Sequence, residues 1–317
     1  MGEYVKSSQT YHIPVMVQEV VDGLITYENG VYVDATVGGG GHSSAMLDML
    51  GPTAKVVGID RDAESISQVS GLLSSDSRFY ICQGSFTELD RILTEFCCGQ
   101  IHGILYDLGV SSRQIDSPSR GFSYRLDGPL DMRMDNNLPI DAAKFIASSS
   151  RDEIANVLRD YGEERNAFPI ARALVHRRSS CPIETTGHLR DVIETTRPKM
   201  LNKTLARVFQ AIRIAINDEL VQLSDSLDTA LKRLGSGGRL VTIAYHSLED
   251  RIIKKKMADL IRSCNCPSQL PMCICGGLAE FVKVGIGRFY PSKEEVARNN
   301  RARSATLRIY EKRGIET

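Results

Sequence analysis

Short apolar runs alternate with stretches of helical periodicity over the first third of the chain. The runs are rich in Val and Ile, which is typical of strands buried on both faces of a sheet. They predict strands over residues 31–36, 56–60, 79–82 and 101–108. Apolar spacing predicts helices over residues 15–24, 43–50, 63–73 and 87–96. The alternation indicates an α/β domain whose mostly parallel sheet carries helices on both faces.

The pattern changes in the middle of the chain, where helical segments follow one another without strands. Helices are predicted over residues 151–161 and 164–177, and a long helical stretch over 205–234 ends at Gly235 and Gly237-Gly238. The strand pattern then returns over residues 239–244, 281–284 and 305–310, with a helix over 249–261. We therefore expect residues 1–135 and 205–317 to form the α/β domain and residues 136–204 to form an inserted helical domain.

Composition is that of an ordinary globular protein, with 42% hydrophobic and 25% charged residues among 317. There is no apolar run of about 18 residues that could span a bilayer. The segment Met1-Gly2-Glu3-Tyr4 lacks the basic and then apolar layout of a secretory signal. The sequence therefore predicts a cytoplasmic protein with no membrane partner.

Charge is balanced over the whole chain, with 39 basic and 39 acidic residues, but it is distributed unevenly. Between Arg165 and Arg213 there are ten Lys or Arg and three Asp or Glu. Such a stretch can face nucleic-acid phosphates, or it can be a set of solvated helix faces. The candidates for RNA contacts are Arg172, Arg177, Arg178, Lys199, Lys203 and Arg207, with a second patch at Arg251, Lys254, Lys255 and Lys256.

A glycine loop lies between the first predicted strand and the next helix, in the segment Asp34-x-Thr36-x-Gly38-Gly39-Gly40-Gly41-His42. Backbone amides at such a helix start can bind a carboxylate or phosphate, although a tight turn needs glycines too. Asp60 ends the next strand, where an acid can accept hydrogen bonds from ribose hydroxyls. No Gly-Lys-Ser/Thr follows, as a triphosphate loop requires, and Ser43 stands where a dinucleotide site needs its third glycine. S-adenosylmethionine fits these features best.

Polar residues also follow the fourth predicted strand, in Asp107-Leu108-Gly109-Val110-Ser111-Ser112. In an open α/β sheet this is the edge at which ligands bind. The chain continues through Gln114, Arg120-Gly121-Phe122-Ser123 and the segment from Asp127 to Asp135, which is dense in polar, Gly and Pro residues. Such a loop is either functional or a well-ordered connection into the helical insertion.

The chain resembles the RsmH (MraW) family of small-subunit rRNA cytosine-N(4) methyltransferases nearly from end to end. Besides the segments above, the resemblance rests on His12-Ile13-Pro14-Val15, Tyr161-Gly162-Glu163-Glu164-Arg165, His246-Ser247-Leu248-Glu249-Asp250-Arg251 and Arg301-Ala302-Arg303-Ser304. Three departures stand out. Leu205-Ala206-Arg207-Val208 replaces a more polar Thr-x-x-Thr approach to Phe209. Ala244-Tyr245 precedes His246 where the family usually has Ser-Phe, and Asn299-Asn300 stands where Asn-Pro is common.

The resemblance implies a class I methyltransferase fold, S-adenosylmethionine as methyl donor, and a decoding-centre cytidine of small-subunit rRNA, or of an assembling small subunit, as acceptor. By motif position it assigns cofactor contacts to Gly40, Gly41, His42, Asp60, Phe86, Asp107 and Gln114. Phe86 would line the adenine pocket. Taken without the family, Phe86 is a core aromatic residue.

Methylation of the cytosine amine requires an oriented acceptor and a way to remove its proton. We expect Asp107 to serve both the cofactor and the floor of the site. Ser111, Ser112 or His246 can then accept a hydrogen bond from the amine or relay its proton, although His246 can instead stabilise its loop. No covalent cysteine is needed, so Cys82, Cys97 and Cys98 are expected to be buried, inert thiols.

Four further cysteines, Cys264, Cys266, Cys273 and Cys275, are clustered near the end of the chain. They can bind a tetrahedral zinc, although Cys-x-Cys is tighter than the usual spacing, or they can be free thiols. The metal content is therefore an open question at this point. Rival functions are a methyltransferase for DNA or protein, a nicotinamide oxidoreductase, and a catalytically silent RNA-binding assembly factor.

Overall fold

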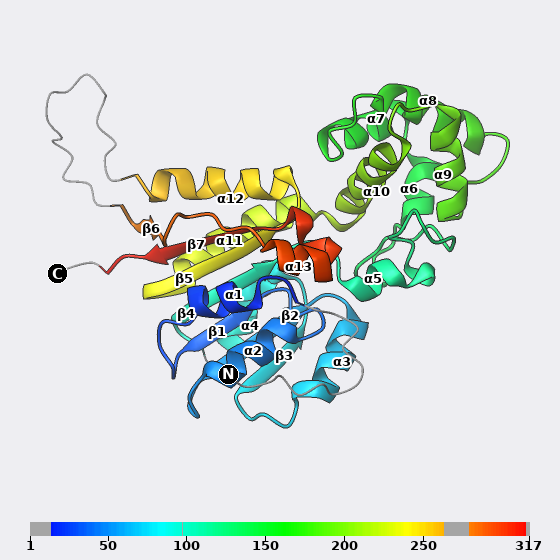
Figure 1. Ribbon diagram of the computed structural model, residues 1–317. Helices are drawn as coiled ribbons and strands as arrows, with labels where there is room; N and C mark the ends of the chain where they lie inside the picture. The colour runs from blue at the N-terminus through cyan, green and yellow to red at the C-terminus, as the bar shows by residue number, and fades with distance from the viewer. Residues whose placement is uncertain (1–13, 97, 263–278, 315–317) are drawn as a thin grey trace, which may run out of the picture. The chain divides into compact units, whose positions relative to one another are not determined.

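The computed structural model describes residues 14–96, 98–262 and 279–314 (Figure 1). These residues separate into two compact units. Unit 1 contains the described residues up to Gly109 and from Leu220 onward, and unit 2 contains Val110–Glu219. The contact boundaries therefore lie at 110 and 219, whereas the sequence pattern placed the insertion at 136–204. The polar loop before residue 136 and the helix after residue 204 belong to unit 2.

A seven-stranded sheet forms the centre of unit 1, in the order β3-β2-β1-β4-β5-β7-β6. Its strands are β1 (Val31–Asp34), β2 (Lys55–Asp60), β3 (Phe79–Gln83), β4 (Ile101–Asp107), β5 (Leu234–Ala244), β6 (Phe281–Lys283) and β7 (Thr306–Lys312). The strands from β3 to β5 in this order pair in parallel. Strand β7 runs antiparallel to both β5 and β6. The predicted α/β architecture, a mostly parallel sheet with a helical insertion, is confirmed.

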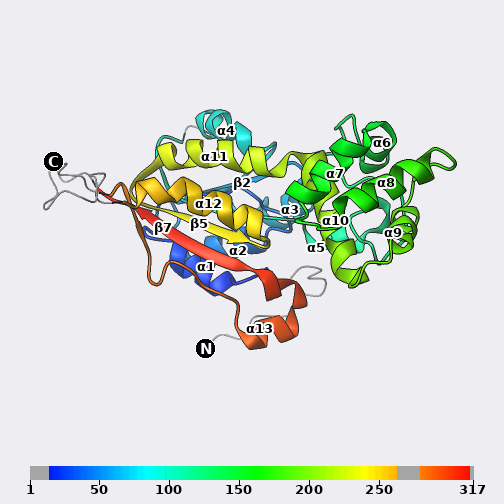
Figure 2. The same ribbon diagram turned by 90° about the horizontal axis from the view of Figure 1, so that it is seen from above.

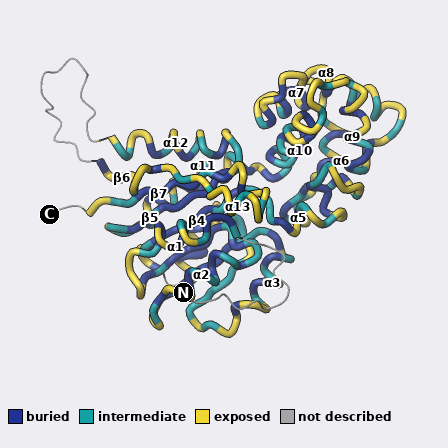
Figure 3. Tube along the Cα trace, viewed as in Figure 1, coloured by how far each residue is buried: buried dark blue, intermediate teal, exposed yellow. Residues whose placement is uncertain are grey.

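Two apolar cores cover the two faces of this sheet. Helices α4, α11 and α12 pack on one face and helices α1, α2 and α3 on the other (Figure 2). Because both faces are covered, strand residues such as Tyr32, Val56 and Ile104 are fully buried, as the dark blue strands of Figure 3 show. The helices are α1 (Val17–Leu24), α2 (Gly41–Met49), α3 (Ala63–Leu73), η1 (Phe86–Glu88), α4 (Leu89–Glu95), α11 (Glu219–Arg233), α12 (Ser247–Leu260), α13 (Lys293–Arg298) and η3 (Asn300–Ser304).

Unit 2 is helical and has a core of its own. Its helices are α5 (Ser112–Asp116), η2 (Pro118–Arg120), α6 (Ala142–Ser148), α7 (Arg151–Asp160), α8 (Ala167–Arg178), α9 (Thr186–Thr195) and α10 (Leu201–Asn217). Apolar side chains of the loop before α6, including Phe122, Leu130 and Met132, are buried with those of the helices. The loop is therefore part of the fold of this unit.

The long helical stretch expected over 205–234 consists of two helices in the structure. Helix α10 ends at Asn217, Asp218 adopts the left-handed conformation with φ of 51°, and α11 begins at Glu219. Asp is one of the few residues that tolerate this conformation. Apolar spacing continues on both sides of the break, so periodicity alone does not reveal it. The strand β5 also begins earlier than expected, at Leu234, and takes in the glycines that the pattern assigned to a turn.

None of the helices in the described ranges is both long and apolar enough to span a bilayer.

Candidate active site

Three aspartates end neighbouring parallel strands of unit 1. Asp34, Asp60 and Asp107 are the last residues of β1, β2 and β4, and these strands lie side by side in the order β2-β1-β4. Parallel strands present their carboxyl ends at the same edge of a sheet. We call this the carboxyl edge. Strand β5, next to β4, contributes Tyr245 immediately after its last residue.

The glycine loop after β1 is shaped by two residues with positive φ, Gly38 at 50° and Gly40 at 79°. Glycine adopts these angles without strain because it has no Cβ. The amide of Gly40 donates to the carbonyl of Val37 at 2.8 Å, so its N–H is already used. Because Gly40 has no side chain, a ligand can still approach its backbone closely. No side chain caps α2, which leaves the first-turn amides of Gly41, His42 and Ser43 as the donors that this helix start offers an anion.

Asp60 has both oxygens bonded to backbone amides. Oδ2 accepts from the N–H of Gly38 at 2.9 Å and Oδ1 accepts from the N–H of Asp62 at 2.9 Å. Each carboxylate oxygen has a second lone pair, so Asp60 can still accept from ribose hydroxyls. Burial raises the pKa of Asp60 to about 6, against the lowering effect of the two amides. The carboxylate is therefore ionised at neutral pH and becomes protonated in mildly acidic solution.

Asp34 lies beneath the loop and is fully buried. Its Oδ2 accepts from the hydroxyl of Ser43 at 2.7 Å, and its Oδ1 accepts from the N–H of Thr36 at 3.3 Å. Burial raises the pKa of Asp34, and the nearby His42 opposes this rise. Asp34 therefore connects β1 to the start of α2 and faces inward.

Asp107 is contacted on both of its carboxylate oxygens. The hydroxyl of Tyr245 donates to Oδ1 at 2.9 Å, and Nε2 of His42 lies 3.4 Å from Oδ2. The backbone N–H of Asp107 donates to the hydroxyl of Thr36 at 2.7 Å. Burial raises the pKa of Tyr245 well above its usual value, and the charge of Asp107 adds to this, so the phenol stays a donor. The carboxylate is thus fixed in one orientation, with 14% of its side chain exposed.

His42 is the histidine of the glycine loop, and its side chain is buried. Burial alone would lower its pKa, but the carboxylates of Asp107, Asp34 and, from α13, Glu295 outweigh this effect and raise it. Within the described part of the chain, Nδ1 of His42 has no hydrogen-bond partner. A buried imidazole that favours the charged form and has an uncommitted nitrogen suits the carboxylate of an amino-acid ligand.

His246 caps the first turn of α12. Its Nδ1 accepts from the N–H of Glu249 at 3.5 Å, and its Nε2 lies 3.1 Å from Oε1 of Glu249. Oε2 of Glu249 accepts in turn from the backbone amides of Tyr245 and His246. Next to it, Asp250 forms an ion pair of 2.6 Å with Arg308 of β7. These contacts give much of the His246–Arg251 motif a structural role, which is one of the two interpretations left open for His246.

Phe86 opens η1 and is buried, with 7% of its surface exposed. Its ring packs edge-on against Tyr106, with 5.8 Å between centroids. The guanidinium of Arg61, the residue after Asp60, lies 5.6 Å from the centre of the Phe86 ring. The ring is therefore placed by the core on one side and by a residue of the β2 edge on the other.

Ser111, Ser112 and Gln114 lie in unit 2 and form the start of α5. Oγ of Ser111 accepts from the N–H of Gln114 at 3.2 Å, and Oε1 of Gln114 accepts from the N–H of Ser111 at 3.0 Å. This is a capping box. Ser112 and Gln114 are buried, at 8% and 6% exposure. Within unit 2, the hydroxyl of Ser111 and the amide oxygen of Gln114 thus stabilise a helix end.

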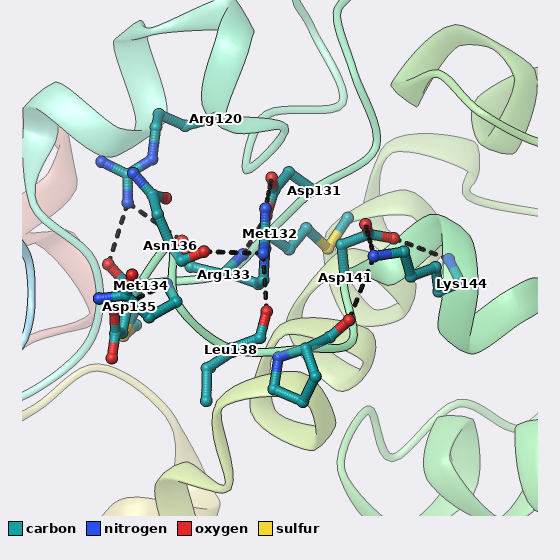
Figure 4. Close-up of polar contacts among 12 residues, drawn as sticks. Arg120, Asp131, Met132, Arg133, Met134, Asp135, Asn136, Leu138, Asp141 and Lys144 are labelled. Carbon is teal, nitrogen blue, oxygen red and sulfur yellow. Dashed lines mark hydrogen bonds and ion pairs between the residues drawn. The ribbon is translucent and has the colours of Figure 1, made fainter.

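The polar loop of unit 2 satisfies its own hydrogen-bonding groups (Figure 4). Arg133 pairs with both oxygens of Asp131 at 2.7 Å and also donates to the carbonyls of Asn136 and Leu138. Arg120 donates to the carbonyls of Arg133 and Met134. These hydrogen bonds and ion pairs order the loop internally.

Two residues outside this network connect the loop to the helices of unit 2. Asn217, the last residue of α10, donates to the carbonyl of Met132 at 2.8 Å and accepts from the N–H of Met134 at 2.7 Å. Oδ1 of Asp127 accepts from the N–H of Gly187 in the first turn of α9 at 2.8 Å. The loop thus stabilises two helix ends. These contacts support the interpretation of the loop as a well-ordered connection into the helical insertion.

The six predicted RNA contacts of unit 2 differ in their surroundings. Arg172, Lys199 and Lys203 are exposed. Arg178 donates to the carbonyls of Ile146 and Ser149, and Arg207 forms an ion pair of 2.6 Å with the buried Glu164. Arg177 is partly buried. Arg178 and Arg207 therefore already have contacts inside unit 2, whereas the three exposed residues present their charge to solvent.

The clustered cysteines Cys264, Cys266, Cys273 and Cys275, and also Cys97, lie outside the described residues. Within the described ranges, no group of three or more His, Cys, Asp or Glu side chains is placed to bind a metal ion. Cys98 is buried, and both Cys82 and Cys181 are partly buried free thiols. Burial raises the pKa of the Cys82 thiol, which makes it a poor nucleophile.

Sequence reasoning missed several residues of the carboxyl edge. Asp34, Tyr245 and Glu295 were not among the predicted site residues, yet each contacts or faces His42 or Asp107. The signal for Tyr245 was present as a departure from the family pattern. Glu295 is distant in sequence and carried no signal.

Residues 9–313 match the sequence family described as the MraW methylase family. A protein of Fusobacterium nucleatum named ribosomal RNA small subunit methyltransferase H is 40% identical over 97% of this chain and 98% of its own length. A protein of the same name from Heliobacterium modesticaldum is 42% identical over 95% and 98%.

Solved structures give more distant likenesses. An rRNA methylase from Streptococcus thermophilus is 11% identical with a TM-score of 0.42, and the alignment covers 94% of each chain. A protein from Streptococcus mutans described as a methyltransferase, in complex with SAH, is 12% identical with a TM-score of 0.43, over 95% of this chain and 99% of that one.

Proposed function

Because the chain belongs to the MraW methylase family, we propose that it methylates small-subunit ribosomal RNA, with S-adenosylmethionine as donor. The acceptor in this proposal is the exocyclic N(4) amine of a decoding-centre cytidine. The substrate is the rRNA itself or an assembling small subunit, which places the protein in the cytoplasm. The observation that carries the proposal is Asp107 at the end of β4, fixed on both oxygens by Tyr245 and His42 beside the glycine loop.

The residues of unit 1 fit this cofactor. Its amino-acid end carries a carboxylate, which the amides of Gly41, His42 and Ser43 and the uncommitted Nδ1 of His42 can bind. Its ribose offers two hydroxyls to Asp60. Phe86 would contact the adenine, and Gln114 of unit 2 is proposed as a further contact. When bound, S-adenosylmethionine supplies an electrophilic methyl group on a sulfonium.

The acceptor amine is a poor nucleophile because its lone pair is delocalised into the cytosine ring. Asp107 can accept a hydrogen bond from one amine N–H, which orients the nitrogen toward the methyl group and increases its electron density. Methyl transfer forms a nitrogen–carbon bond, breaks a sulfur–carbon bond and leaves one proton to be removed from the nitrogen. Asp107, Ser111, Ser112 and His246 are the proposed acceptors or relays of that proton.

Unit 2 provides the proposed contacts to the rRNA backbone. Arg172, Lys199 and Lys203 are its exposed candidates, and Arg177 is partly exposed. Arg178 and Arg207 remain in the proposal, but each must also keep its contact inside the unit. The target base must leave its stack or lie in accessible RNA.

The test is to map methylated nucleotides in small-subunit rRNA from cells with and without the protein. Loss of one N(4)-methylcytidine in its absence, restored by the wild-type protein but not by Asp107→Asn, is the expected result. Transfer of labelled methyl by the purified protein to small-subunit rRNA, and not to DNA or protein, is expected in parallel. An unchanged rRNA map together with transfer to DNA or protein would overturn the proposed acceptor. Cofactor binding without transfer to any of the three would indicate a catalytically silent assembly factor.

A further inference from the structure

A basic segment of unit 1 lies at the carboxyl edge, beside the site residues. It consists of the loop before α13, α13 itself and η3, which follows it (Figure 1). Phe289 pairs with Leu307 by two backbone hydrogen bonds, and Thr306, the residue before it, pairs with Ala244 at the end of β5. The segment is thus placed where β5 leads into Tyr245.

Glu295 shows how near this segment comes to the site. Its Oε1 accepts from the backbone N–H of Met16 at 2.7 Å. Its charge also raises the pKa values of His42 and Tyr245. Asp107 raises both more strongly, while burial lowers the pKa of His42 and raises that of Tyr245. Helix α13 therefore lies next to the cluster that contains Asp107.

The outer side of the same segment carries positive charge. Residues 288–304 contain five basic residues and two acidic ones, Glu294 and Glu295. All five basic residues are exposed. In the described ranges, Arg288, Lys293, Arg298 and Arg303 form no ion pair with an acidic side chain, unlike Lys256, which lies 2.6 Å from Asp228. These charges are therefore available to an external anion.

An aromatic ring accompanies the charges. Tyr290 is 57% exposed, and the guanidinium of Arg288 lies 4.9 Å from its ring centre. Exposed rings beside basic side chains are a common platform on which single-stranded nucleic acids stack a base while their phosphates contact the charges.

We propose that this surface binds the single-stranded RNA that flanks the methylated nucleoside. We call it the carboxyl-edge basic surface, and it consists of Arg288, Tyr290, Lys293, Arg298, Arg301 and Arg303. The proposal rests on the proposed function and adds a second RNA contact, in the catalytic unit rather than in the helical one.

Electrostatics explain why such a surface is needed here. The strand ends place the carboxylates of Asp60 and Asp107 at one edge, and they repel a polyanion that approaches. Basic residues beside that edge offset the repulsion and attract the backbone on each side of the target base. An anionic membrane would require a larger apolar area, and the exposed large apolar residues of this segment are Ile286 and Tyr290 alone.

The test compares two triple variants of the full-length protein. Lys293→Gln/Arg298→Gln/Arg303→Gln removes three charges from the carboxyl-edge basic surface. The matched control, Lys232→Gln/Arg262→Gln/Arg313→Gln, removes three exposed charges near the ends of α11, α12 and β7, at the opposite edge of the sheet. Affinity for a small-subunit rRNA fragment is measured as a function of salt, together with calorimetric binding of S-adenosylmethionine.

The surface variant is expected to bind RNA at least tenfold more weakly, with a salt slope smaller by about 2, because each lost contact to a single strand contributes about 0.7. Tyr290→Leu is expected to weaken binding by about tenfold without changing the salt slope. Cofactor binding should stay at the wild-type level in every variant, which also shows that unit 1 is folded.

Three results would overturn one proposal or both. If the wild type methylates rRNA and the surface variant matches it in affinity and salt slope, the surface assignment alone is wrong. If the wild type neither binds nor methylates rRNA, the proposed function fails, and the surface assignment with it. Loss of binding to anionic vesicles, with RNA binding unchanged, would assign the surface to a membrane instead.

Discussion

The carboxyl edge of unit 1 and the polar loop of unit 2 are both dense in charged residues, but they use them differently. In the loop, Asp131 and Arg133 pair with each other, and Arg133 also donates to nearby carbonyls. At the edge, the imidazole of His42 keeps an uncommitted nitrogen, and Asp60 and Asp107 retain lone pairs for a ligand. Both segments belong to the family signature, yet their contacts separate a site with an unpartnered buried nitrogen from a loop whose acid and base are already paired with each other.

The largest expected effect concerns Asp107. Asp107→Asn should reduce methyl transfer by at least about a hundredfold, because the amide is a weaker acceptor and does not carry the charge that orients the amine. Single-turnover transfer of labelled methyl to rRNA measures this. Asp90→Asn, at an exposed aspartate of α4, is the control and should match the wild type. A folded Asp107→Asn enzyme with normal turnover would show that Asp107 has a structural role, like the charged residues of the loop.

The loop should respond in stability rather than in chemistry. Asp131→Ala breaks a partly exposed bidentate pair and should destabilise unit 2 by about 1 to 2 kcal/mol. Burial alone would raise the pKa of Asp131, but Arg133 outweighs it, so the pKa is lowered. The stabilisation is therefore complete at neutral pH and is lost as the pH falls through the lowered value.

Hydrogen exchange of the backbone amides of unit 2 measures the loss of stability in Asp131→Ala. Binding of S-adenosylmethionine to the same variant serves as the control. Protection should fall in α6 and α9, while cofactor affinity stays unchanged. If cofactor affinity fell and protection did not, the loop would have to be counted with the site.

Asp60 should make cofactor binding depend on pH. Its pKa of about 6 means that the carboxylate that accepts from the ribose is present above pH 6 and is protonated below it. Affinity for S-adenosylmethionine should therefore fall by up to about tenfold between pH 7 and pH 5. Asp60→Asn should bind S-adenosylmethionine weakly at both pH values, with no change in affinity between them. Calorimetry at pH 7 and pH 5 measures this. A change in affinity that persists in the variant would assign the titration to another group.

The smallest effect is expected from Tyr245→Phe, which removes one hydroxyl from Asp107 and restores the residue common in the family. Turnover should fall by about two- to tenfold with little change in KM, because the carboxylate loses one of its two orienting contacts. A purely structural role would lower thermal stability and leave turnover unchanged.

The sequence predicted the carboxyl edge well, for a physical reason. Parallel strands end at one edge, so Asp60 and Asp107 could be assigned to a common region before their strands were placed. The contact between Tyr245 and Asp107 could not be predicted, because these residues are separated by 138 positions and meet only through the pairing of β4 with β5. Local periodicity contains no information on strand order.

The helical half was harder to predict. Apolar spacing continues across Asp218, so the break between α10 and α11 was not visible, although Asp218 is a residue type that allows it. Counts of charged residues likewise treat Arg207 and Lys203 alike. In the structure, Arg207 pairs with the buried Glu164, whereas Lys203 is exposed. The difference depends on which face of α10 is covered.

The position of β7 inside the sheet also governs how the protein is made. Strand β6 pairs only with β7 among the described strands, and β7 completes the hydrogen bonding of β5. During synthesis, β5 remains an unpaired edge of the sheet until more than 60 further residues have been made and β7 has left the ribosomal tunnel. A nascent chain that already contains the carboxyl ends of β1, β2 and β4 therefore still lacks α13, β6 and β7, and the proposed carboxyl-edge basic surface is the last part of the site to form.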